Sequence, residues 1–206
     1  MASEIKANKI SPATGTAFTI GDSGDTFTLP SGATLAVASG ATISNAGTAS
    51  GFFDGLKELD KWYVNGTISI GGASVLLTSL ARSTLNGFTK KGTGMSESSG
   101  VFSFPSTGYW QVVFQAYFWG DSVASASYVG GVIEATVDNG SNWATESVLY
   151  NDIYSTVAYA ATTTGTIFNV TDIANDKLRF RVNSSGNVKI NGSQAASTIQ
   201  FMKLSD

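Results

Sequence analysis

Three aromatic residues beside polar turns are the side chains of this 206-residue sequence best suited to hold a ligand. Trp143 follows the turn-forming run Asp138–Asn142, and Trp119 and Tyr128 flank a segment that begins Gly120-Asp121-Ser122. A flat aromatic face can stack on a sugar ring while Asn, Asp or Ser side chains bind the sugar hydroxyls. Aromatic residues near turns also commonly close the end of a β-sandwich, because they bury a large area. We therefore treat the three as candidate glycan contacts, with closure of a sandwich as the alternative.

Other chemistry is restricted by what the sequence lacks. It contains no cysteine and no histidine, which removes disulfides, thiolate metal sites and the commonest general base and zinc ligands. The 15 acidic residues lie mostly singly in turn contexts, as Asp22 and Asp138 do. The run Asp138–Asn142 is rich in oxygen ligands but lacks the spacing and final glutamate of a calcium loop. We expect no enzyme, no catalytic residue, no metal and no cofactor; a glycan-active enzyme with an Asp/Glu pair is a third, weaker hypothesis.

Composition favours an all-β protein. Hydrophobic residues make up 42% of the chain and mostly stand singly among Ser, Thr, Gly and Asn, which suits short strands joined by many turns. The formal net charge is −3, so no basic surface is expected to attract nucleic acid. No apolar run reaches the length of a signal peptide or a membrane span, so we expect synthesis in the cytoplasm and no membrane insertion.

A repeat with a period of eight residues occupies positions 24–47. Its units begin at Gly24, Gly32 and Gly40 and follow the pattern Gly-x-Thr-apolar-x-apolar-x-x, except that the third unit has Asn45 at the second apolar position. The two apolar positions of a unit share one face of a short strand, and the Gly/Ser or Pro/Ser pairs supply corners. Such short units are stable only when stacked, so we predict a stalk in which several identical chains wind together. Its core would be Phe27, Leu29, Leu35, Val37 and Ile43; the alternative is a flexible linker.

The repeat divides the chain into four expected parts. Residues 1–23 read as an extended strap that anchors the protein through Ile5, Ile10, Phe18 and Ile20. Residues 24–47 form the stalk, and residues 48–63 form a junction with a short helix near 56–63. Residues 64–206 form a head domain with an antiparallel β-sandwich.

Period-two alternation in the head predicts ten strands. They lie near 67–70, 76–80, 87–90, 100–104, 108–119, 130–137, 147–150, 164–170, 177–182 and 197–203. The strand at 109–119 is apolar or aromatic on both faces, so we expect a core on one face and another subunit on the other. Its candidate core or trimer-interface residues are Tyr109, Trp110, Val112, Phe114 and Phe118.

The run Gly100–Trp110, in which Phe104-Pro105 leads through Gly108 into a long aromatic strand, resembles the central motif of the tumour-necrosis-factor and complement-globular-head family. The last strand, Ser197–Leu204, is similar to the last strand of that family. The resemblance covers roughly residues 64–206. It implies a ten-stranded jelly roll that assembles as a compact homotrimer, with the aromatic strand at the three-fold axis.

Residues 3–52 resemble the leading segment of structural proteins from tailed bacteriophages, especially marine ones. This resemblance implies a protein of the virion surface that binds capsid or tail proteins through its N-terminus. The short stalk favours a trimeric capsid fibre or decoration (cement) protein. The alternative is a receptor-binding tail-fibre tip whose head binds a host-surface glycan.

Overall fold

The computed structural model describes residues 14–15, 20, 22–44, 56–85, 87–120, 126–153 and 158–205. The chain divides into two units, residues 1–52 and 53–206, and each is described by itself. The strands of the described part all belong to the second unit, the head. One sheet contains β1 (Leu59–Val64), β2 (Ile68–Gly71), β4 (Leu80–Arg82), β7 (Gly108–Gly120), β10 (Tyr159–Val170), β12 (Asn187–Ile190) and β13 (Thr198–Ser205). The other contains β3 (Ser74–Leu76), β5 (Ser96–Ser98), β6 (Val101–Ser103), β8 (Val129–Thr136), β9 (Ala144–Asn151) and β11 (Lys177–Ser184).

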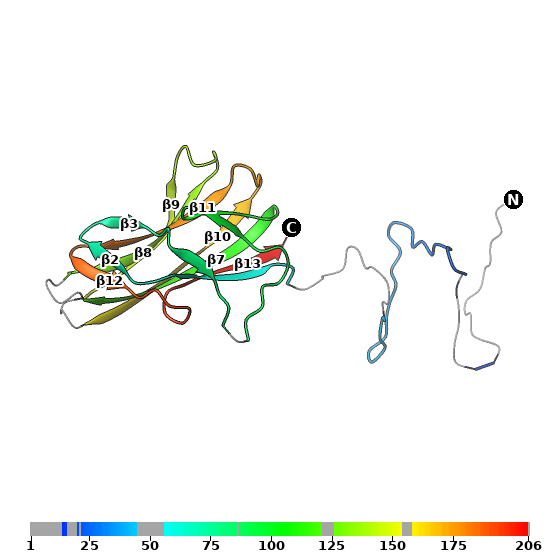
Figure 1. Ribbon diagram of the computed structural model, residues 1–206. Helices are drawn as coiled ribbons and strands as arrows, with labels where there is room; N and C mark the ends of the chain where they lie inside the picture. Colours follow the sequence, from blue (N-terminus) through cyan, green and yellow to red (C-terminus); the bar gives the residue numbers. More distant parts are fainter. Residues whose placement is uncertain are drawn as a thin grey trace. The chain divides into compact units, whose positions relative to one another are not determined.

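The two sheets form an antiparallel sandwich, which confirms the predicted all-β fold class (Figure 1). The seven-stranded sheet runs in the order β2-β12-β7-β13-β1-β4. β12 and β13 pair with different parts of one edge of β7, and β10 pairs with its opposite edge. The six-stranded sheet runs β5-β6-β11-β8-β9, and β3 pairs with the second half of β11. β10 and β9 are therefore edge strands, and β7 lies inside its sheet with a long neighbour on each side.

The core lies between the sheets and is dominated by aromatic rings. The ring of Phe102 lies 5.2 Å from that of Trp62, 5.5 Å from that of Phe180 and 5.0 Å from that of Phe201. Phe114 completes the cluster, 5.4 Å from Phe180. These residues come from β1, β6, β7, β11 and β13, so the cluster joins both sheets. Aromatic pairs at such distances contribute about 1 kcal/mol each beyond the area they bury.

The predicted helix near residues 56–63 is wrong, because Leu59–Val64 is strand β1 between β13 and β4. Asp60, Trp62 and Val64 point inward at a period of two residues. Asp60 is only 1% exposed, and its carboxylate accepts hydrogen bonds from Arg82, from the Trp62 indole and from the Met95 backbone. These partners lie up to 35 residues away, so no local helix signal could reveal them.

Two of the ten predicted strands differ from the structure. Residues 87–90 form no strand, although Lys91 makes an isolated bridge with Leu59. Residues 76–80 hold two strands, because β3 ends at Leu76 in one sheet and β4 begins at Leu80 in the other. The chain crosses between the sheets at Leu77, whose backbone N–H donates to Phe180. Strands β1, β5 and β12 were not predicted.

In the first unit, residues 22–44 contain three turns of one kind. The N–H of Asp25 donates to the carbonyl of Asp22, Ala33 donates to Pro30, and Ala41 donates to Ala38. The third residue of each turn is a glycine with φ of 96°, 83° and 82°, a conformation that favours glycine. The turns thus recur every eight residues, where the sequence places corners, and the chain between them is not paired as a strand.

Candidate interaction surfaces

The outward face of the seven-stranded sheet is a candidate interaction surface of the head. The register of β7 and β10 places Tyr109 beside Asn169, Gln111 beside Ile167, and Trp119 beside Tyr159. Their side chains point away from the core, and Tyr109, Ile167 and Tyr159 are 47%, 61% and 68% exposed. Neither β7 nor β10 contains a charged residue. Exposed apolar side chains on an uncharged sheet face are typical of interaction sites, so this face is a candidate association surface.

A shallow hollow interrupts this face at Gly165. It has a volume of about 380 Å³ and is lined by Gln111, Val112, Val113, Gly165, Thr166 and Ile167. The hollow exists because Gly165 has no side chain, and a Cβ there would meet the Val112 carbonyl oxygen at 3.0 Å.

The structure separates the five β7 residues that the sequence grouped as core or interface. Trp110, Val112, Phe114 and Phe118 are fully buried within the chain, so they belong to the core. Tyr109 alone points outward. The sequence reading missed Ile167 and Tyr159, although their outward positions follow from the alternation of β10, where every second residue is exposed.

Trp143 lies on the outward face of the six-stranded sheet and stacks on a guanidinium group. The Arg179 guanidinium carbon is 4.2 Å from the centre of the Trp143 ring, and Arg179 Nε donates to Glu134 Oε2 at 2.5 Å. The indole N–H donates to the carbonyl oxygen of Gly140 at 3.1 Å. One face of the Trp143 ring is therefore occupied within the chain.

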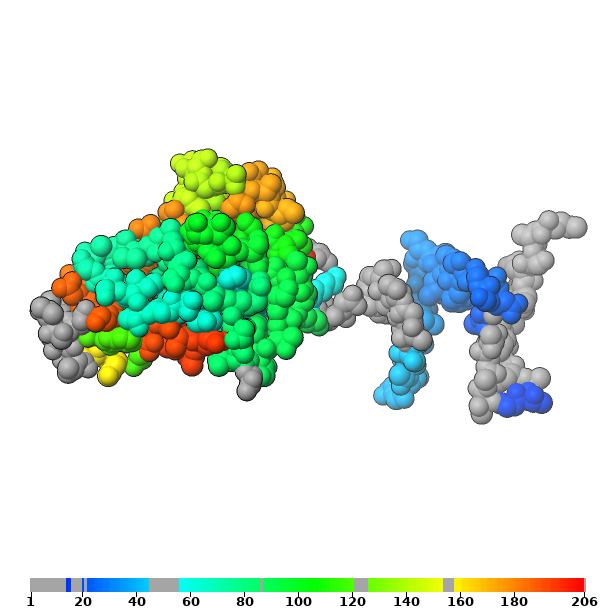
Figure 2. All heavy atoms as spheres, viewed as in Figure 1, coloured from blue at the N-terminus to red at the C-terminus, as the bar shows by residue number. Residues whose placement is uncertain are grey.

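The segment before Trp143 is a tight turn, as the sequence indicates, and its centre is Asp138. The hydroxyl of Thr136 and the backbone and side-chain amides of Asn142 donate to the Asp138 carboxylate. These hydrogen bonds lower the pKa of Asp138 from 3.8 to about 2. The neighbouring β10–β11 loop joins this turn through the Asn139 N–H, which donates to the Asn175 carbonyl, and the two project together at the top of the head (Figure 2).

Tyr128 packs against a tyrosine that the sequence reading did not single out. Its ring lies 5.3 Å from that of Tyr150, edge to face. The Tyr150 ring covers Gly130, and its hydroxyl accepts a hydrogen bond from Asn183 at 3.2 Å. Tyr128 and Tyr150 are both exposed at this surface, which we call the tyrosine pair. The pairing depends on the register of β8 and β9, so no local signal could have found Tyr150.

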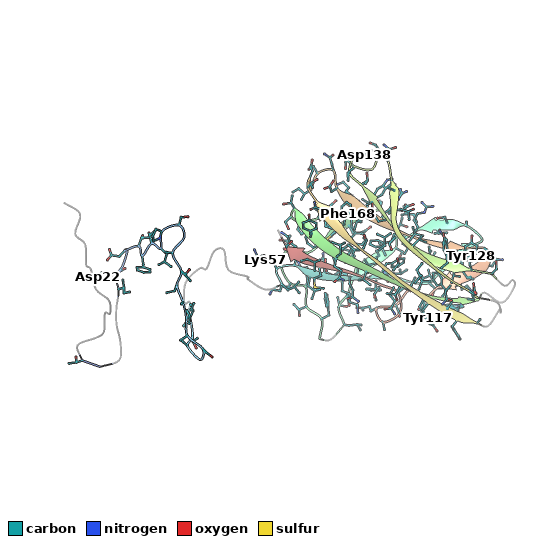
Figure 3. The ribbon with its side chains drawn as sticks, turned by 180° about the vertical axis from the view of Figure 1, so that it is seen from behind. Asp22, Lys57, Tyr117, Tyr128, Asp138 and Phe168 are labelled. Carbon is teal, nitrogen blue, oxygen red and sulfur yellow. The ribbon has the colours of Figure 1, made fainter. Side chains whose placement is uncertain are left out.

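The three predicted glycan contacts therefore form no single site. Trp119 belongs to the seven-stranded sheet, where it pairs in register with Tyr159 and Lys189. Tyr128 and Trp143 lie on the other sheet, beside opposite ends of the hairpin of β8 and β9. Figure 3 places Tyr128 and Tyr117 near one end of the head and Phe168 near the other. Phe168 and Asn142 line a cavity of about 250 Å³ beside Trp143.

The predicted anchor and stalk residues belong to the first unit. Ile5, Ile10 and Phe18 lie outside the described residues, and Ile20 is exposed. The stalk residues Phe27, Leu29, Leu35, Val37 and Ile43 are all exposed in the single chain. Within the described ranges, no group of three or more Asp and Glu side chains could hold a metal ion. No helix in those ranges is long and apolar enough to cross a membrane.

The strand order and the packing of the two sheets define the head as a jelly roll of the tumour-necrosis-factor type. Among solved structures, murine APRIL is similar to this chain with a TM-score of 0.53 and 14% identity, over 71% of this chain and 98% of the APRIL chain. Eiger TNF from S. frugiperda is similar with a TM-score of 0.52 and 18% identity, over 72% of this chain and 92% of the Eiger chain. At these identities the likeness is one of fold. No family profile matches the chain, and no curated protein sequence does.

Proposed function

We propose that this chain is a virion structural protein of a tailed bacteriophage. It acts as a homotrimeric capsid fibre or decoration protein, anchored by its N-terminus and displaying the jelly-roll head. The observation that carries the self-association is the uncharged, half-apolar outward face of β7 and β10. In one chain this face leaves Tyr109, Ile167 and Tyr159 in water, and association of identical heads removes them from it.

The phage location rests on the N-terminal sequence and on the design of the whole chain. A strap and a short repeat precede a folded head, an order that suits a protein held to a particle at one end. Three copies of one strap bind together, so weak contacts of each strap add to a tight attachment. No catalytic step belongs to this proposal, since both tasks are binding tasks.

Labelled antibodies raised against the head provide the test. On purified particles, a capsid decoration protein should show label over the whole shell, including shells that lack tails, at many tens of copies per particle. Label confined to the tail tip would contradict the decoration role and support the alternative below. Absence of label from particles whose genome encodes the chain would contradict the virion assignment.

A receptor-binding tail-fibre tip is the second candidate, and the tyrosine pair favours it. The outward face of the six-stranded sheet stays exposed if the opposite sheet associates, and it presents two tyrosine rings with the Asn183 amide beside them. Flat rings and amide groups together suit the faces and hydroxyls of a sugar.

The receptor role can be tested separately from the location. The purified protein should block adsorption of phage to the host, and Tyr150→Ala should reduce that block at least tenfold. Ile173→Ala, which changes an exposed residue of the β10–β11 loop, is the matched control and should leave the block unchanged. Equal activity of both variants would contradict a glycan site at the tyrosine pair.

A further inference from the structure

The repeat segment, residues 22–44, has a regular backbone but no strand partner among the residues that the structure describes. Its three turns recur every eight residues with the same hydrogen bond and the same glycine conformation. Each of its 23 residues is exposed, and none of them belongs to a strand. Four extended residues between turns span only about 13 Å. The segment therefore consists of short extended stretches joined by a turn every eight residues, and it is not one continuous strand.

The exposure of the apolar side chains repeats with the same period of eight residues. Phe27, Leu35 and Ile43 occupy equivalent positions and are 65%, 62% and 59% exposed. Leu29 and Val37, two residues further on in their units, are both 43% exposed. The first two units thus present their apolar pairs in the same way, and the third repeats the first apolar position with Ile43. A random linker would not keep five apolar side chains in one phase along a regularly turning backbone.

We infer that three copies of residues 22–44 interleave into a layered β-prism, with the five apolar side chains at its axis. In this arrangement, residues 22–44 of two further copies cover the exposed apolar side chains of the first copy. The inference rests on the proposed homotrimer, and it adds the register in which the repeat segments of neighbouring chains pair. Under three-fold symmetry, a chain that advances one side per unit places each unit directly above the preceding unit of its neighbour. Residue i of one chain then lies beside residue i+8 of the next.

The sequence suits this register at each position. Residues eight apart are Thr26, Thr34 and Thr42 on the outside, and Phe27, Leu35 and Ile43 on the inside. Stacked neighbours therefore match in size and polarity, and the glycine turns stack on one another. Residues 26–44 carry no charge, so stacking brings no like charges together. The extended backbone of each unit gains the hydrogen-bonding partner it lacks in one chain.

Cysteine pairs can measure the register, because the natural chain contains no cysteine. Thr28 and Ala36 face outward, between the inward apolar residues of their units, and are eight residues apart. Stacked strands lie about 4.8 Å apart, which is within the Cα separation of about 4.4–6.8 Å that a disulfide needs. The full-length double variant Thr28→Cys with Ala36→Cys should therefore form a covalent trimer when treated with oxidised glutathione.

Two controls fix the interpretation of that experiment. Thr28→Cys with Ser44→Cys places the thiols two layers apart, near 10 Å, and should give at least tenfold less covalent trimer. Each single-cysteine variant should run as one chain on a non-reducing denaturing gel. Thr26→Cys with Thr34→Cys is a second pair in the same register, in case the first pair disturbs assembly.

The possible outcomes separate this inference from the proposed function. Covalent trimers from both pairs eight residues apart support the interleaved prism. Covalent dimers from single-cysteine variants would overturn it, because identical residues would then be neighbours. Double variants that run at the mass of a single chain on the non-reducing denaturing gel would also overturn it. Light scattering on the same samples before denaturation tests the proposed homotrimer separately. A trimer that forms no cross-links contradicts only the interleaved prism, whereas a monomer contradicts both the prism and the homotrimer.

Discussion

The ring of Tyr150 occupies the space that a side chain at Gly130 would need. The two residues are partners in the register of β8 and β9, and a Cβ at position 130 would lie 2.5 Å from Tyr150 Cδ1. Gly130 thereby lets a large ring lie against the sheet with its other face in solvent. The exposed tyrosine surface of the head depends on this one glycine.

Gly130→Ala should displace the Tyr150 ring and destabilise the head by about 1–3 kcal/mol, the usual cost of overpacking. Urea denaturation followed by fluorescence measures the change. Gly71→Ala is the matched control, because a Cβ there meets only Asn187 Oδ1 at an ordinary 3.6 Å. A Tyr150→Ala background should remove most of the Gly130→Ala cost, and an unchanged cost would contradict the steric explanation.

Asp60→Ala should destabilise the head far more than the loss of an exposed ion pair. The Asp60 carboxylate binds Arg82 Nε and Nη2 at 3.0 Å each and the Met95 N–H at 2.9 Å, so its removal leaves inward-facing donors without an acceptor. Loss of the carboxylate leaves the Trp62 indole N–H and the Met95 backbone N–H unpaired in the interior, at about 1–3 kcal/mol each. Glu134→Ala removes an acceptor from Arg179 alone, in a pair whose side chains are 21% and 16% exposed, and should cost about 1–2 kcal/mol. Equal losses in thermal or urea unfolding would contradict the special role of Asp60.

The pKa of Asp138 predicts the acid behaviour of the β8–β9 turn. The Thr136 hydroxyl is the largest cause of the lowered pKa, followed by the Asn142 amides. Because the folded pKa lies below the unfolded value, the stabilisation is present above about pH 4 and is lost as the pH falls towards 2. Titration by NMR should give a pKa near 2 in the wild type. Thr136→Val should raise the pKa and Thr136→Ser should keep it low; a pKa near 4 in the wild type would contradict these contacts.

Ile167→Lys tests the association surface. A buried lysine at this outward position of β10 would lose its hydration without a carboxylate nearby on β7 or β10, so the trimer should dissociate at a protein concentration at least tenfold higher than the wild type needs. The head should stay folded, because Ile167 points away from the core. Size-exclusion chromatography with light scattering measures the change in mass. Ile173→Lys, in an exposed loop, should resist dilution as the wild type does, and an Ile167→Lys trimer with the same resistance to dilution would contradict an interface on this face.

Alternation along the chain predicted most strands of the sandwich. In β11, Leu178, Phe180 and Val182 point inward between polar residues, and such a pattern needs no knowledge of distant contacts. β1 was mistaken for a helix because residues 56–59 are good helix formers. Its strand conformation is stabilised by pairing with β13, more than 130 residues away.

The interaction surfaces were harder to predict than the strands. The contacts of Tyr150 with Gly130 and of Trp143 with Arg179 join residues that the sheet register brings together. The sequence indicated single aromatic residues at turns as candidate glycan contacts, but it could not show that Trp119 and Trp143 lie on different sheets. The period-eight turns were predictable, because a Gly-x-Thr-apolar sequence marks each unit locally.

The mass of the full-length protein in solution tests the central claim most directly. Light scattering at micromolar concentration should give a mass about three times the 21.4 kDa of one chain. The mass should stay constant on tenfold dilution, because the associating face of β7 and β10 is large and uncharged. A mass equal to that of one chain would contradict the homotrimer and with it the account of the association surface and the stalk.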